Sequence, residues 1–186
     1  MTYGTLPPDR YPPLSKLLHW VVAFCVLATL AIALVMTRLP DGPFKDGLFV
    51  WHKGLGVLIL FLIVLRIVNR ILTGAPAPEP GLARWQKAAS SAVHGLLYVA
   101  LVAMPIIAWL GMSTFGEGAP FFGLFSLPPI TGKDEAMSET LFVVHGWLGY
   151  FVILLVAMHI GAALQHYFIH KDGVVQRMLP RALGGR

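Results

Sequence analysis

Four apolar segments, each about twenty residues long, constrain this chain more than any other feature. They cover approximately Leu17–Thr37, Trp51–Leu72, Ala92–Met112 and Leu141–Leu164. A helix rises about 1.5 Å per residue, so each segment is long enough to cross a hydrocarbon core of about 30 Å. The chain is 56% hydrophobic and only 12% charged, which is unlike a soluble domain of this length. Because lipid offers the backbone no hydrogen-bond partners, we expect an all-α membrane protein, a four-helix transmembrane bundle formed by residues 1–186 as one domain.

Basic residues are distributed unevenly among the connections between these segments. Ten of the 14 Lys and Arg residues precede the first segment, lie around the second connection or follow the fourth segment. The other two connections hold the remaining four, together with six of the nine acidic residues. By the positive-inside bias, both termini are therefore expected in the cytoplasm of a cell whose inner membrane holds the protein. The net charge of +5 follows from this asymmetry and indicates contact with anionic lipid rather than nucleic acid.

Histidines occur inside the apolar segments, where titratable groups are costly and usually functional. His145 and His159 are fourteen residues apart, which places them on nearly the same helix face and about 21 Å apart along the axis. The topology then assigns His52 and His145 to an outer level. It assigns His19, His94 and His159 to an inner level.

Paired neutral imidazoles from different helices are the axial ligands that a low-spin b-type haem needs. The only cysteine, Cys25, excludes an internal disulfide, c-type haem attachment and an iron–sulfur cluster held by this chain alone. The two histidine levels therefore predict two stacked b-type haems, with one helix supplying a ligand to each.

Two sets of neighbouring residues have two possible roles each. Glycines near the histidines could admit a large flat ring close to the backbone, or could simply pack helices: Gly54, Gly56, Gly95, Gly146 and Gly149. Arg66, Arg70 and Lys171 could bind haem propionates, although basic anchors at the cytoplasmic interface are the commoner role at such positions.

Several sequence strings resemble the prokaryotic cytochrome b561 family. They are SKLLHW at residues 15–20, WHKGLG at 51–56, AVHGLLY at 92–98 and HGWLGY at 145–150, followed by His159 and by HYF at 166–168. The resemblance covers nearly the whole chain. It implies a four-helix inner-membrane protein with two b-type haems. Carried over residue by residue, it assigns His52 and His145 to the outer haem and His19 and His159 to the inner one, leaving His94 as a non-ligand.

The resemblance also implies a reaction. Family members are thought to exchange electrons with ubiquinone, and one branch oxidises superoxide at the periplasmic side. A cation near the outer haem would steer that anion. Lys53, next to His52, is the candidate for this catalytic role, with Lys45 and Lys133 behind it. The acidic balance of the outer connections opposes it.

Two other functions compete with a stand-alone electron carrier. The chain could be the haem-bearing membrane subunit of a larger dehydrogenase, of the hydrogenase or formate dehydrogenase type, although its short outer connections leave little room for docking. It could also be a transporter that uses histidines as zinc or copper ligands. A transporter would favour ligands converging near mid-membrane with carboxylates, whereas these segments contain no Asp or Glu.

Overall fold

The fold is that of a computed structural model, in which residues 10–79 and 81–179 are described. Within these residues the chain forms the long helices α1 (Pro13–Met36), α2 (Pro43–Thr73), α3 (Arg84–Phe115) and α4 (Glu135–Gln165). A π-helical turn, η1 (His166–His170), follows α4 directly. All four long helices are apolar and long enough to cross a membrane. Each begins before its apolar segment, so the helix ends extend towards the headgroup region.

Local sequence explains where the helices begin and end. α1 and α2 begin with Pro13 and Pro43, whose missing N–H costs nothing in a first turn. The side chain of Asp134 caps α4 by accepting a 3.0 Å hydrogen bond from the N–H of Met137. α3 ends at Gly116, which adopts a left-handed φ of 102° that a side chain would disfavour.

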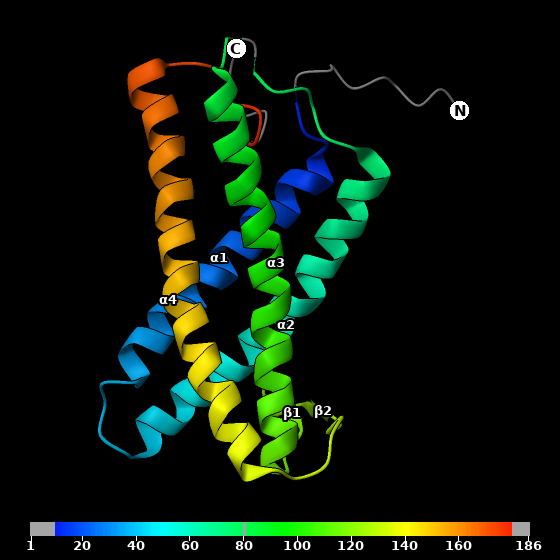
Figure 1. The fold of residues 1–186 in the computed structure, drawn as a ribbon, viewed down its shortest axis with the longest axis vertical. Helices are drawn as coiled ribbons and strands as arrows, with labels where there is room; N and C mark the ends of the chain where they lie inside the picture. The colour runs from blue at the N-terminus through cyan, green and yellow to red at the C-terminus, as the bar shows by residue number, and fades with distance from the viewer. Residues whose placement is uncertain (1–9, 80, 180–186) are drawn as a thin grey trace.

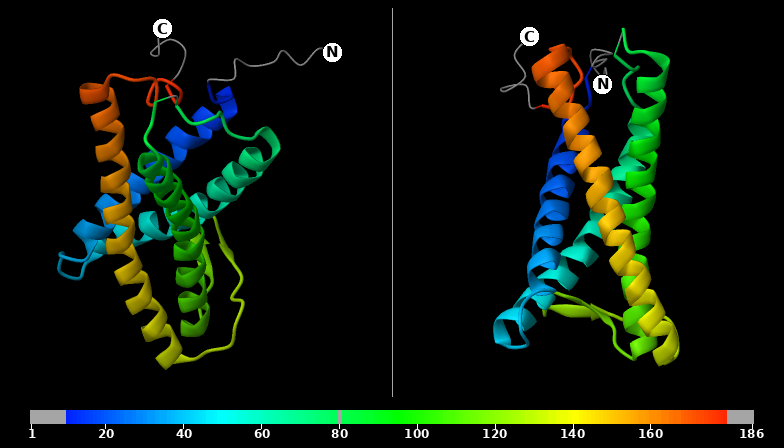
Figure 2. Two further views of the ribbon diagram at one scale, coloured as in Figure 1. Left: turned by 45° about the horizontal axis from the view of Figure 1, so that its top comes forward. Right: turned by 60° about the vertical axis from the view of Figure 1, so that its left-hand side comes forward.

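The helices pack as two pairs. α1 packs mainly against α2, and α3 packs mainly against α4. Figure 1 shows α3 and α4 upright and side by side, with α1 and α2 crossing behind them at an angle, and Figure 2 shows the same arrangement from two other directions. Tyr11 and Arg177 lie together at one end, where the Tyr11 N–H donates to the Arg177 carbonyl at 3.4 Å. The first and last described parts of the chain therefore share one side of the membrane, as four spans require.

Each helix pair has its own core. Val22, Cys25 and Val26 of α1 pack with Leu55, Ile59 and Ile63 of α2, whereas Ala100 of α3 packs with Val152 and Leu155 of α4. Leu30, Leu101 and Val156 contact both clusters and join the pairs.

The third connection contains a small β-hairpin that the sequence did not predict. Strands β1 (Ala119–Phe121) and β2 (Phe125–Leu127) pair antiparallel at the end of the bundle where α3 ends and α4 begins (Figure 1). Phe122 sits in the turn with a φ of 50°, and its ring lies 5.3 Å from that of Trp51 in α2. A Cβ built on Gly54 would come within 2.6–2.8 Å of the Phe122 ring. The absence of a side chain at Gly54 therefore makes room for the hairpin.

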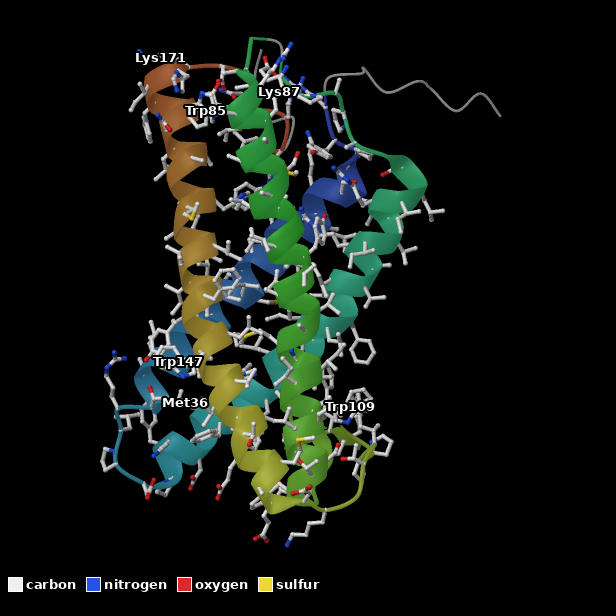
Figure 3. All side chains as sticks on the ribbon, viewed as in Figure 1. Met36, Trp85, Lys87, Trp109, Trp147 and Lys171 are labelled. Atoms are coloured by element: carbon white, nitrogen blue, oxygen red, sulfur yellow. The ribbon has the colours of Figure 1, made fainter. Side chains whose placement is uncertain are left out.

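The segment after η1 folds back onto the other end of the bundle. Lys16 donates a 2.8 Å hydrogen bond to the Leu179 carbonyl, and Trp20 donates a 3.0 Å bond to the Met178 carbonyl. Arg177 forms a 2.9 Å ion pair with Glu79. Figure 3 shows Trp85, Lys87 and Lys171 at this same end, whereas Trp109 and Trp147 lie in the opposite half. The basic and aromatic residues thus mark two interfaces, as expected for a membrane-spanning bundle.

Candidate functional site

The outer level brings together His52 of α2 and His145 of α4. Their ring centroids are 6.1 Å apart and the ring planes meet at 83°. Both rings are half-buried. The sequence predicted this pairing from depth alone, because α2 and α4 both begin at the outer side.

Backbone carbonyls lie beside both outer imidazoles. Nδ1 of His145 donates a 3.2 Å hydrogen bond to the carbonyl of Met104, so Nε2 of His145 is the nitrogen with a free lone pair. Such a bond also fixes the orientation of a ligating imidazole. The carbonyl of Thr29 interacts with the His52 ring, but among the described residues the buried Nδ1 of His52 has no partner at hydrogen-bond distance.

The inner level brings together His19 of α1, His94 of α3 and His159 of α4. The ring centroids of His19 and His159 are 6.1 Å apart, the same separation as in the outer pair. His94 lies closer to His159, at 5.1 Å, and its Nδ1 is 3.2 Å from the hydroxyl of Ser90. α4 therefore places one histidine in each level, as its fourteen-residue spacing predicted.

Arg66 of α2 also belongs to the inner level, and its partner was missed by sequence reasoning. Its Nε donates a 3.0 Å hydrogen bond to the hydroxyl of Tyr98 in α3, and its guanidinium lies 5.7 Å from the centre of the Tyr98 ring. The sequence did contain a signal for the depth of Arg66. Arg66 is fourteen residues from His52, the same spacing as between His145 and His159. Arg70, one turn further, is exposed and contacts Tyr11 instead.

The lysines of the outer side differ in their partners. Lys45 donates a 2.8 Å hydrogen bond to Asp41, and this ammonium lowers the pKa of the Asp41 carboxyl group. Lys133 forms a 3.0 Å ion pair with Glu135. Lys53, half-buried beside His52, forms no ion pair within the described part of the chain. Of the three lysines, only Lys53 combines proximity to the outer level with a charge that no acid neutralises.

Beyond the inner level, His166 begins η1 and pairs with Asp172. Nδ1 of His166 lies 2.6 Å from the Asp172 carboxylate, and both side chains are largely shielded from solvent. Single π-helical turns are frequently found at functional sites, and this one begins with a histidine that is paired with an acid. Within residues 10–79 and 81–179, no three His, Cys, Asp or Glu side chains are arranged so that they could hold a metal ion.

The chain is similar along its length to known proteins. Residues 10–181 match the family described as prokaryotic cytochrome b561. Cytochrome b561 homolog 2 of Escherichia coli is 31% identical over 182 residues, covering 96% of this chain and 95% of that protein. Cytochrome b561 homolog 1 of the same organism is 29% identical, covering 93% and 98%. The probable superoxide oxidase CybB of Yersinia pestis is 23% identical, covering 94% and 98%. On this evidence the chain belongs to the prokaryotic cytochrome b561 family.

Proposed function

We propose that this inner-membrane protein carries electrons between a donor on the periplasmic side and ubiquinone, through a b-type haem at each histidine level. The family to which the chain belongs performs membrane electron transfer and binds b-type haem. The observation that carries the proposal is that the histidine rings lie in two pairs, His52 with His145 and His19 with His159. Each pair joins two helices and lies at its own depth.

The distance between the ring centroids in each histidine pair fits the binding of one haem iron between the two imidazoles. An imidazole nitrogen binds a divalent first-row metal at about 2 Å, and its ring centre lies about 1 Å further away. Two imidazoles on opposite sides of one metal therefore have ring centres about 6 Å apart. Both 6.1 Å pairs meet this requirement, and the 5.1 Å separation of His94 and His159 falls short of it. This comparison supports His19 rather than His94 as the partner of His159.

The residues of this chain perform two tasks in the proposed function. His145, fixed by the Met104 carbonyl, presents Nε2 as a preoriented ligand. Leu30, Leu101 and Val156 pack against both apolar clusters and join the two helix pairs that carry the histidines. When bound, the haem supplies an iron that accepts and donates one electron at a time. The helices thus act as an insulated holder for redox centres at two depths.

For the donor we propose superoxide, following the name of the Yersinia relative. Two superoxide anions would each lose one electron to become O2, and one ubiquinone would gain two electrons and two protons to become ubiquinol. Lys53 is the residue that would steer the anion, because Lys45 and Lys133 are both paired with acids. Charge steering changes association rates and weakens as ionic strength rises.

Lys53→Glu should slow the reaction with superoxide by about tenfold or more at low salt, because it replaces attraction by repulsion at the outer level. The rate of ubiquinone reduction driven by a chemical reductant that is uncharged should stay at the wild-type value. Lys133→Glu is the matched control, since Glu135 already offsets that lysine. Superoxide-driven ubiquinol formation would be followed optically. Equal rates in wild type, Lys53→Glu and Lys133→Glu would remove Lys53 from the mechanism.

A further inference from the structure

Arg66 occupies, on the inner level, the place on α2 that His52 occupies on the outer level. The two residues are fourteen positions apart, so they lie on nearly the same helix face and about 21 Å apart in depth. The charge of Arg66 acts on the imidazoles of all three inner histidines. α2 thus contributes a ligand candidate outside and a cation inside, both facing the interior of the bundle.

Hydrogen bonds within the protein satisfy only some of the N–H donors of the Arg66 guanidinium. Nε is bonded to the Tyr98 hydroxyl, but Nη1 is buried and has no hydrogen-bond partner among the described residues. The ion pairs in residues 10–79 and 81–179 join Asp41 to Lys45, Glu135 to Lys133, Asp172 to His166 and Glu79 to Arg177. None of these carboxylates reaches Arg66. Its half-buried position also distinguishes it from exposed basic anchors such as Arg70.

A guanidinium is always charged, and a buried charge is costly unless an opposite charge and hydrogen bonds compensate it. The remaining N–H groups of Arg66 form a planar fork that matches a carboxylate or a phosphate. An anionic group bound at the inner level, between Arg66 and the histidines, would supply this compensation. A phospholipid phosphate and a propionate carboxylate of b-type haem are two sources of such an oxyanion.

We propose that Arg66 binds a propionate carboxylate of the haem held at the inner level, with Tyr98 positioning the guanidinium. This inference rests on the proposed function and adds a second attachment point to the axial histidines. A cation beside a redox centre favours the reduced form, because reduction adds negative charge. Arg66 would therefore also raise the midpoint potential of the inner haem relative to the same site without it.

The test compares Arg66→Gln with wild type and with Arg70→Gln, the matched control from the next turn. Each holoprotein would be purified in maltoside detergent, titrated for haem potentials, and mixed with excess apomyoglobin to measure the rate of haem loss. Arg66→Gln should lower one potential only, that of the haem removed by His159→Ala. It should also release this haem roughly tenfold faster, as expected for losing a charged hydrogen bond. Arg70→Gln should match wild type.

Two further variants keep the test decisive if Arg66→Gln folds poorly. Arg66→Lys retains the charge without the fork, so it should keep most of the potential and still release the haem faster. Tyr98→Phe removes the 3.0 Å bond that orients Arg66 and should give a smaller acceleration of loss. Wild-type potentials and loss rates in all three variants would overturn the proposal.

The source of the oxyanion is settled by assaying phosphorus in the same samples. If Arg66→Gln lost one phosphorus per chain while both haem potentials stayed unchanged, Arg66 would bind a lipid phosphate and the proposal would be wrong. If wild-type protein bound two haems and the Arg66 variants behaved like wild type, only the proposed role of Arg66 would be wrong. Wild-type protein without haem would instead overturn the proposed function itself.

Discussion

His145→Ala is expected to reduce the haem content from two per chain to one, and His52→Ala should remove the same haem. His19→Ala and His159→Ala should each remove the other haem. The reason is that, in the proposed function, the two imidazoles of each pair, whose ring centroids are 6.1 Å apart, would together hold one haem iron. Haem per chain from pyridine haemochrome spectra, with the redox spectrum of the haem that remains, would identify which one is lost.

His94→Ala is the control for this set, because His94 lies at the inner level without the separation that two axial ligands need. Both haems should remain, with at most a modest change in the inner one. A His94→Ala protein that retained only one haem would contradict the pairing of His19 with His159. So would a double variant, His19→Ala with His145→Ala, that still bound a haem as tightly as wild type.

Gly54→Val is expected to destabilise the outer end of the bundle by about 1–3 kcal/mol, the usual cost of overpacking. The new side chain would meet the Phe122 ring at less than van der Waals distance, and Phe122 belongs to a constrained hairpin turn. The ring would have to leave α2, taking its contact with Trp51 with it. Denaturant unfolding in detergent, followed through tryptophan fluorescence, would measure the loss.

Gly47→Val is the matched control for this change. Gly47 lies seven residues earlier on the same face of α2, and nothing surrounds its Cβ position within 4 Å. The cause of the Gly54 effect is isolated by a second substitution. Phe122→Ala in the Gly54→Val background should recover much of the lost stability, because it removes the clashing ring. Equal losses with and without Phe122 would show that Gly54 has some other role.

The helices and the two histidine levels could be predicted from the sequence because each depends on a simple regularity. Segment length identifies the spans, charge asymmetry orients them, and helix geometry then gives every histidine a depth. The structure brings His52 to His145, as their depths required, and places both His19 and His94 beside His159, as their shared inner depth required. Depth alone did not choose between His19 and His94 as the partner of His159, and that choice came from the family resemblance.

Other features depend on contacts that no pattern in a single sequence encodes. Strands of three residues separated by a short turn are too brief to produce an alternating signal, so the hairpin was not predicted. The contact of Gly54 with the Phe122 ring depends on that hairpin, so the sequence could not predict it. The hydrogen bond from His145 to Met104 uses a backbone acceptor, which any residue would provide. Arg66 carried a recognisable spacing, but its burial and its bond to Tyr98 required the fold.

The most direct test of the central claim is the haem content of the purified wild-type protein. The protein would be isolated in detergent, its reduced-minus-oxidised spectrum recorded, and haem per chain counted as the pyridine haemochrome. The two-level arrangement of histidines predicts two b-type haems per chain. A preparation of folded protein that contains none, even after expression with an ample haem supply, would contradict the account and return the histidines to packing or metal-binding roles.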